Sequence, residues 1–174
     1  MERLIVAGFG GQGVLSLGQI IAYASMYENK NVTWLPSYGP EMRGGTANCS
    51  VVVDDNPIAS PVIATPDTLI AMNKPSLDKF IDKVKSGGLV LVNSSLISEK
   101  VKREDVTVVY VDANAVAHKV GNDKASNLVV LGAYIKYSNL FPKEVMLSTI
   151  EKVFASKPKF IESNKACFMA GYEH

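Results

Sequence analysis

The chain contains little cysteine and little histidine, and this scarcity excludes several kinds of redox and metal centre. Its 174 residues include two cysteines, Cys49 and Cys167, and two histidines. An iron–sulfur cluster is usually held by four cysteine thiolates, so this chain cannot hold one by itself. The cysteines form no C-x-x-C pair and no zinc framework with the histidines. We expect both thiols to be buried and inert, and we predict no metal site in this chain.

Strong charge and long hydrophobic runs are also missing. The formal net charge is +1 and charged residues make up 20% of the chain. This balance gives no reason to expect nucleic acid or an anionic membrane as a partner. No apolar run approaches the roughly 18 residues of a membrane span, and the start lacks the basic region of a signal peptide. We expect a cytoplasmic protein without membrane contact, folded as a single domain over residues 1–174.

Short apolar segments alternate with helical patterns along the chain. Buried strands are predicted at 4–7, 32–35, 47–53, 68–72, 89–92 and 106–111. Helices are predicted from 14 to about 24, from Pro75 to about 85, at 113–120, at 127–137 with Ser126 as N-cap, from Pro142, and after Pro158. Pro36 is expected to stop the second strand. The alternation predicts an α/β protein, a Rossmann-like three-layer αβα sandwich with a mostly parallel sheet.

The first motif is a glycine turn near the start of the chain, Gly8-Phe9-Gly10-Gly11-Gln12-Gly13. It joins a buried strand to a helix, so its backbone N–H groups lie where an anion can bind. The spacing fits the G-x-G-x-x-G pattern of dinucleotide-binding proteins, which also need an acidic residue at the end of the second strand. That strand ends in Trp34-Leu35-Pro36-Ser37, without a carboxylate. The missing carboxylate weakens the dinucleotide interpretation, and the absence of a following Gly-Lys-Ser/Thr excludes a Walker loop.

The second motif is the segment Tyr38-Gly39-Pro40-Glu41-Met42-Arg43-Gly44-Gly45. Its glycines and proline exclude a regular helix or a central strand. Arg43 has a planar guanidinium suited to a carboxylate or a phosphate, and the glycines allow a ligand or another backbone to approach closely. Two interpretations stay open: Arg43 binds an anionic group, or it pairs with Glu41 simply to hold the loop.

The remaining polar candidate is His118, for which a catalytic role stands against a solvated or structural one. No serine or cysteine lies near a histidine and a carboxylate in the sequence. We predict no catalytic residue in this chain.

Taken together, these residues resemble the gamma subunit, or gamma domain, of 2-oxoacid:ferredoxin (acceptor) oxidoreductases, the family of the pyruvate, 2-oxoglutarate and ketoisovalerate enzymes. The resemblance covers nearly the whole chain and rests on the two glycine-rich motifs at 8–13 and 38–45. Further matching positions are Pro66-Asp67, Gly87-Gly88, Asn127 with Leu131-Gly132, and Asn164 with Ala166.

The resemblance implies a subunit rather than a complete enzyme. Such complexes oxidatively decarboxylate a 2-oxoacid, transfer the acyl group to coenzyme A and pass electrons to ferredoxin. Thiamine diphosphate, magnesium and the iron–sulfur clusters belong to other subunits, so no cofactor is expected on this chain alone. The expected partners are the alpha and beta subunits, with a delta subunit as a further candidate, and ferredoxin through the complex.

The resemblance also implies that the chain packs against the thiamine-binding subunits and helps to wall the active site. The residues expected there are Gly10, Gly11, Gln12, Gly13, Tyr38, Gly39, Pro40, Glu41, Arg43, Gly44 and Gly45. Arg43 would contact a subunit carboxylate, the oxoacid or the coenzyme A phosphates, Glu41 would orient it, and Tyr38 would pack at the rim. The alternatives are a free-standing Rossmann-like NAD(P)-binding oxidoreductase and a purely structural subunit. Pyruvate, 2-oxoglutarate and branched-chain oxoacids all remain open as substrates.

Overall fold

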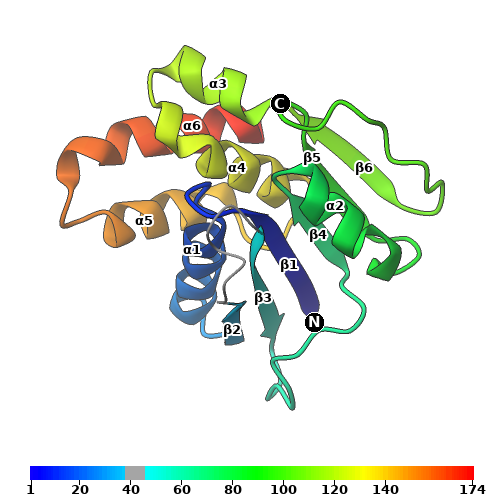
Figure 1. Ribbon diagram of the computed structural model, residues 1–174. Coiled ribbons are helices and arrows are strands. Elements are labelled where there is room, and N and C mark those ends of the chain that lie inside the picture. Colours follow the sequence, from blue (N-terminus) through cyan, green and yellow to red (C-terminus); the bar gives the residue numbers. More distant parts are fainter. Residues whose placement is uncertain (38–45) are drawn as a thin grey trace.

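The computed structural model describes residues 1–37 and 46–174, whose strands form one six-stranded sheet (Figure 1). The strands are β1 (Glu2–Phe9), β2 (Asn31–Ser37), β3 (Thr46–Asp54), β4 (Thr68–Ala71), β5 (Leu89–Asn93) and β6 (Thr107–Val111). The α-helices of this part are α1 (Val14–Tyr27), α2 (Lys74–Phe80), α3 (Ala113–Val120), α4 (Ser126–Ser138), α5 (Lys143–Val153) and α6 (Ile161–Tyr172). Short 3₁₀ turns lie at η2 (Ile81–Lys83), η3 (Asp123–Ala125) and η4 (Pro158–Phe160).

The strand order is β2-β3-β1-β4-β5-β6. Strands β1, β4, β5 and β6 run parallel, whereas β3 is antiparallel to both of its neighbours, β1 and β2. Strand β2 therefore points the same way as β1, and five of the six strands share one direction. The predicted α/β class with a mostly parallel sheet is confirmed. The sequence did not predict that β3 would separate β1 from β2, the two strands that α1 connects.

Strand β2 lies at the edge of the sheet, and its end differs from the prediction. The strand continues through Ser37, with Pro36 opposite Cys49 of β3. The expected stop at Pro36 is wrong because an edge strand needs hydrogen bonds on one side only. Proline is tolerated there when its nitrogen faces away from the neighbouring strand.

Two helix boundaries also differ from the prediction. Ser126 is the first residue of α4 rather than its N-cap, and no side chain caps that helix. Helix α2 ends at Phe80, before the predicted end near residue 85, and continues as the η2 turn. The side chain of Asn73 caps α2 by accepting a hydrogen bond from the backbone N–H of Ser76 at 2.9 Å.

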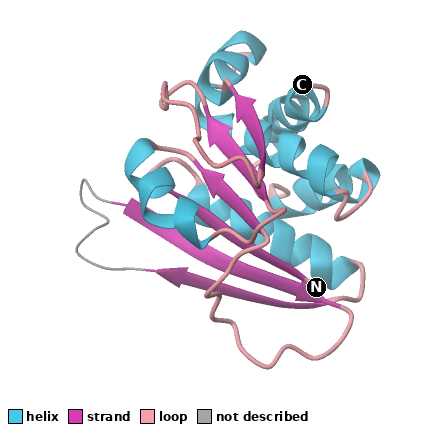
Figure 2. Ribbon diagram, turned by 90° about the vertical axis from the view of Figure 1, so that its right-hand side faces the viewer, coloured by secondary structure: helices cyan, strands magenta, loops and turns pink. Residues whose placement is uncertain are grey.

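The alternating side chains of the strands fill two hydrophobic cores, one on each face of the sheet. On β1, Leu4 and Val6 belong to the larger core, which includes residues of α1, α3, α4, α5 and α6. Ile5 and Ala7 point the other way, into a smaller core formed with α2. Figure 2 shows helices on both sides of the strands. Strand β1 is therefore buried on both faces and lies with β4 in the middle of the sheet.

Helices α4 and α6 approach each other at two glycines. A Cβ atom on Gly171 would lie 1.8 Å from the carbonyl oxygen of Val129, and one on Gly132 would lie 2.0 Å from the carbonyl oxygen of Phe168. Both neighbours are backbone atoms, which cannot turn aside as a flexible side chain can. The helix pair depends on these two positions having no side chain.

We predict that Gly171→Ala destabilises the protein. Alanine favours the helix by about 1 kcal/mol relative to glycine. Overpacking against a backbone costs about 1–3 kcal/mol or more, and at 1.8 Å we expect it to exceed the gain. Chemical denaturation should therefore show a net loss of about 2 kcal/mol. Ser148→Ala, on the exposed face of α5, is the matched control and should change stability by no more than about 0.5 kcal/mol. Equal stability of the two variants would contradict the close-packing account.

A partly buried carboxylate, Glu2, lies at the start of β1. Its Oε1 atom accepts hydrogen bonds from the hydroxyl of Thr68 at 2.7 Å and from the hydroxyl of Tyr134 at 3.1 Å. Burial raises the pKa of Glu2 above its ordinary value, and the two hydroxyl donors oppose this only in part. The folded protein therefore holds the Glu2 proton more tightly than the unfolded chain does.

The raised pKa of Glu2 predicts how stability depends on pH. Stability from this group is fully present below its ordinary value of 4.5 and is lost as pH rises through the folded-state pKa. Glu2→Gln cannot ionise and keeps an acceptor oxygen. The unfolding free energy of Glu2→Gln minus that of the wild type should therefore increase as pH rises from about 4 to about 8. A difference that stays constant over this range would show that Glu2 is not perturbed.

Candidate functional site

The carboxyl ends of β1 and β4 frame the candidate site. The chain leaves β1 through a tight turn into α1, on one face of the sheet, and leaves β4 toward α2 on the other face. The N–H of Met72, just after β4, donates to the carbonyl oxygen of Ala7 at 2.8 Å. In open α/β sheets, ligands bind outside the strand ends at the point where successive connections diverge in this way.

The turn after β1, which we call the glycine loop, spans residues 8–13. Gly11 and Gly13 have φ angles of 90° and 74°, in the left-handed region that favours glycine. Gly8 has an ordinary φ, but a Cβ atom there would lie 2.6 Å from Oε1 of Gln12 and 2.8 Å from Cβ of Met72. The glycine loop therefore has no space for a side chain at Gly8, and a side chain at Gly11 or Gly13 would strain the backbone.

Gln12 braces the glycine loop from within. Its Oε1 atom accepts the N–H of Phe9 at 2.6 Å, and its Nε2 atom donates to the carbonyl oxygen of Met72 at 3.3 Å. The amide thus links the loop to the end of β4. Both ends of the Gln12 amide therefore have partners within this chain, and its predicted place at an interface or active-site wall stays a prediction.

Asn127, on α4, holds the other end of the loop. Its Nδ2 atom donates to the carbonyl oxygen of Gly13 at 3.2 Å, and the residue is only 5% exposed. A Cβ atom on Gly13 would lie 2.4 Å from this Nδ2 atom. No local sequence pattern predicts this contact, because its two residues are 114 positions apart.

A hollow of about 330 Å³ opens beside the loop. It is lined by Phe9, Gly10, Gly11, Gly13, Val14, Leu15, Ser16 and Ala47. Three of these residues begin α1, whose N-terminus has no side-chain cap. The structure thus brings the predicted residues Gly10, Gly11 and Gly13 together at one opening. None of the described lining residues is charged, so the partial positive charge of the helix N-terminus is not neutralised there.

The second motif lies outside the described residues, and this includes Tyr38, Gly39, Pro40, Glu41, Arg43, Gly44 and Gly45. Its flanking residues can be placed. Ser37 pairs with Asn48 at the end of β2, and Thr46 pairs with Phe9 at the end of β1. Both flanks therefore lie at the glycine-loop end of the sheet. The roles of Tyr38, Glu41 and Arg43 stay predictions.

Both cysteines are free and buried, as expected. The Sγ atom of Cys49 donates to the carbonyl oxygen of Val14 at 3.6 Å, and burial raises the pKa of this thiol to about 12. Burial also raises the pKa of Cys167. A thiol with a raised pKa is a poor nucleophile because the thiolate is the reactive form.

His118 lies at the surface on α3. Its Nδ1 atom is 2.8 Å from Oδ1 of Asp123, and both side chains are well exposed. This placement fits the solvated interpretation of His118. Across residues 1–37 and 46–174, no three His, Cys, Asp or Glu side chains converge as metal ligands would. In the same part of the chain, no helix combines the length and the apolar character that crossing a membrane requires.

We predict that Gly13→Ala destabilises the protein more than Gly11→Ala does. Both place alanine at a positive φ, which costs about 1–2 kcal/mol. A Cβ atom on Gly11 meets no atom within 4 Å, whereas one on Gly13 collides with Asn127. We therefore expect Gly13→Ala to lose about 1–3 kcal/mol more in chemical denaturation. Equal losses would show that the Asn127 contact does not restrict the loop.

Comparison with known proteins identifies the family. The family model described as pyruvate ferredoxin/flavodoxin oxidoreductase matches residues 3–174. The ketoisovalerate oxidoreductase subunit VorA of Methanothermobacter thermautotrophicus is 41% identical over 172 residues, which cover 98% of this chain and 36% of VorA. The 2-oxoglutarate synthase subunit KorC of Methanocaldococcus jannaschii is 37% identical, over 99% of this chain and 92% of KorC.

The fold agrees with these relatives. The crystal structure of the gamma subunit of a keto/oxoacid ferredoxin oxidoreductase from Geobacter sulfurreducens matches with a TM-score of 0.84 and 30% identity, covering 99% of this chain and 97% of that one. The chain spans about a third of the length of the VorA relatives but nearly all of KorC. The match over residues 3–174, together with these relatives, shows that the chain belongs to the pyruvate ferredoxin/flavodoxin oxidoreductase family.

Proposed function

We propose that the chain is the gamma subunit of a thiamine-diphosphate-dependent 2-oxoacid:ferredoxin oxidoreductase, which converts a 2-oxoacid to acyl-coenzyme A. The observation that carries this proposal is the way the same unit occurs among relatives. It makes up nearly all of KorC but only about a third of VorA. A unit that occurs both as a separate chain and joined to a longer polypeptide is expected to function in contact with that polypeptide. We take residues 1–174 as the single gamma domain of the complex.

The residues of the chain fit an auxiliary subunit better than the subunit that carries out the decarboxylation. Both cysteines are buried, and His118 is exposed beside Asp123. The resemblance to gamma subunits implies that this chain alone binds no cofactor, and we expect the isolated chain to be inactive. Thiamine diphosphate, magnesium, iron–sulfur clusters and coenzyme A are expected in the whole complex. The expected partners are alpha and beta subunits, with a delta subunit as a further candidate, and ferredoxin through the complex.

We place the glycine-loop end of the sheet against the thiamine-binding subunits, where it would help to wall the active site. The hollow beside Gly10 and Gly11 and the uncapped N-terminus of α1 favour an anionic group. The segment at 38–45, which carries Arg43, is attached at the same end through Ser37 and Thr46. Coenzyme A phosphates, the oxoacid and a subunit carboxylate are the candidate anions. The cytoplasmic location stays a prediction.

The order of the strands argues against a free-standing NAD(P) enzyme. In dinucleotide-binding folds, the acidic residue that binds the ribose ends the parallel strand beside β1. In this sheet the strand on that side is β3, which is antiparallel, and it pairs Thr46 with Phe9 at this end. Strand β2 lies one place further away and ends in Ser37. Neither residue is a carboxylate.

We predict that Arg43→Ala lowers kcat/KM of the assembled complex for the oxoacid or coenzyme A by about tenfold to a hundredfold. This is the loss expected when a hydrogen bond to a charged group is removed. Arg3→Ala is the matched control, because Arg3 is an exposed arginine near Asp67 at the opposite end of the sheet. Arg3→Ala should leave kcat and KM unchanged.

Unchanged assembly, KM and kcat in Arg43→Ala would refute the role of Arg43. Weaker assembly with unchanged kinetics in the complex that does form would favour the purely structural subunit instead. Size-exclusion chromatography before the kinetic assay separates these two outcomes.

A further inference from the structure

Helix α1 has an unusual composition for a helix at the surface. Its 14 residues contain no charged side chain, whereas each of the other described α-helices carries at least one lysine. Half of α1 is buried against the sheet, but Ser16, Gln19, Tyr23, Met26 and Tyr27 are exposed. Surface helices usually carry charged residues on the exposed face. The outer face of α1 is therefore exposed in this chain, although it carries no charged residue.

Large hydrophobic side chains occupy the C-terminal half of this face. Tyr23 is 43% exposed, Met26 58% and Tyr27 44%. The two tyrosine rings stack on each other with centroids 6.5 Å apart. The Nζ atom of Lys152 lies 4.1 Å from the centroid of the Tyr27 ring. Aromatic residues with a polar rim are typical of the centre of protein–protein interfaces.

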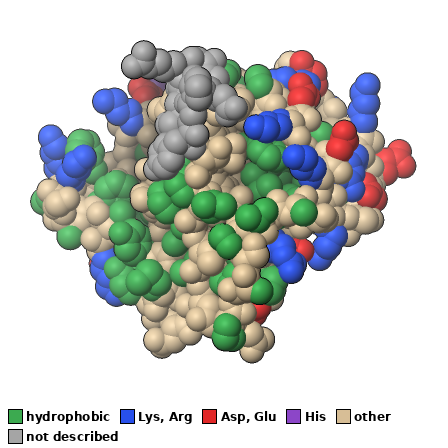
Figure 3. Space-filling view, turned by 60° about the horizontal axis from the view of Figure 1, so that its bottom comes forward, with side chains coloured by type: hydrophobic (Ala, Val, Ile, Leu, Met, Phe, Trp, Pro, Cys, Tyr) green, Lys and Arg blue, Asp and Glu red, His purple; other side chains and the backbone are tan. Residues whose placement is uncertain are grey.

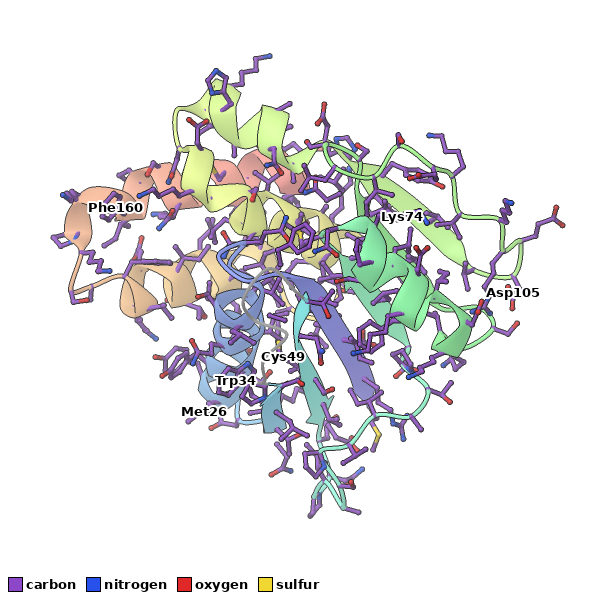
Figure 4. All side chains as sticks on the ribbon, in the orientation of Figure 1. Met26, Trp34, Cys49, Lys74, Asp105 and Phe160 are labelled. Atoms are coloured by element: carbon purple, nitrogen blue, oxygen red, sulfur yellow. The ribbon has the colours of Figure 1, made fainter. Side chains whose placement is uncertain are left out.

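The edge strand β2 extends this surface. Val32 and Trp34 are partly buried and pack against the core that α1 covers. Trp34 fits against α1 at Gly18, where a Cβ atom would lie 3.1 Å from the indole ring. Figure 4 shows Met26 and Trp34 on the same side of the molecule. Figure 3, in which the bottom of the Figure 1 view comes forward, shows hydrophobic side chains gathered on the face toward the viewer. Strand β2 contains no charged residue either. We call the exposed face of α1 together with β2 the α1–β2 surface.

We propose that the α1–β2 surface is the docking site for the companion polypeptide that VorA relatives carry in the same chain. About two thirds of VorA lies outside the region that matches this unit, so in those proteins a further polypeptide is joined to it. An uncharged surface with exposed aromatic residues fits an apolar partner surface, because burying an unpaired charge against it is costly. This proposal rests on the proposed function.

The surface is also continuous with the candidate site. Helix α1 begins at the glycine loop, and β2 ends at Ser37, where the segment at 38–45 begins. A companion chain bound along α1 would therefore reach the hollow beside Gly10 and Gly11. One contact would both hold the complex together and close the opening at the N-terminus of α1.

The test is co-expression of the full chain with the polypeptides of the same organism that match the rest of VorA. Met26→Glu places a charge on the α1–β2 surface while keeping a similar helix propensity. We expect it to weaken assembly at least about tenfold, as loss of a central interface residue does. Val62→Glu is the matched control, because Val62 is 68% exposed and lies in the loop between β3 and β4, outside the residues that define this surface. It should assemble within about twofold of the wild type.

A second measurement separates docking from folding. Trp34 is the single tryptophan of the chain. When the chain labelled with 5-fluorotryptophan binds an unlabelled companion, its one ¹⁹F resonance should shift. Thermal unfolding of the isolated Met26→Glu chain should match that of the wild type, because Met26 is mostly exposed.

Three results would overturn the proposal. The first is assembly of Met26→Glu like that of the wild type. The second is an equal loss of assembly in both variants, which would show that any added charge suffices. The third is a dimer of the isolated chain that Met26→Glu converts to a monomer, which would assign the surface to a second copy. Failure of the proposed function looks different, because the wild-type chain would then not assemble with these polypeptides at all.

Discussion

The structure depends on the tight exit of the chain from its central strand. Strand β1 is paired on both edges, with β3 and β4, and is buried on both faces. The chain leaves it through a turn in which Gly8 and Gly13 have no space for a Cβ atom. Gly8 supplies the space for this turn, and Gly13 supplies the left-handed backbone that starts α1. Gln12 then ties the turn to β4, and Asn127 ties it to α4, so the elements around it are held in register.

Local patterns in the sequence predicted the elements well, because each pattern reports burial and helix periodicity. The strands on both sides of Pro75 and the helices after Pro142 and Pro158 were found in this way. The neighbours of each strand could not be predicted, because an apolar run such as 47–53 does not indicate which strands it pairs with. Its place between β1 and β2 and its antiparallel direction follow from tertiary packing. The Pro36 error has the same origin, because the cost of proline depends on whether the strand is at an edge.

In the candidate site, too, some features could be predicted from the sequence and others could not. The glycine loop was visible in the sequence because its residue types are dictated by the backbone. Its supports were not visible, since Asn127 is remote in sequence and Met72 contributes only a carbonyl oxygen. Gln12 is expected at an interface or active-site wall, and its amide bonds to Phe9 and Met72 of this chain. The segment with Arg43 lies outside the described residues, so its role rests on residue chemistry and resemblance.

These features suit the proposed role of a subunit that supplies surfaces to a larger complex. The thiols are buried, and the hollow at the glycine loop is lined by backbone and uncharged side chains among the described residues. Family membership, an open strand-end site and an uncharged helix beside it are consistent with one role, in which this chain completes a site that other polypeptides begin. The tight packing of α4 on α6 provides the rigid support such a role needs.

The central claim is that the glycine-loop end of the sheet faces the partner subunits. Hydrogen–deuterium exchange, measured on the chain alone and in the assembled complex, tests this most directly. We predict that assembly slows exchange in the peptide containing residues 8–16, while the turn at Gly87 and Gly88, at the opposite end of the sheet, exchanges as before. Slowed exchange confined to that opposite end, with residues 8–16 unchanged, would contradict the account.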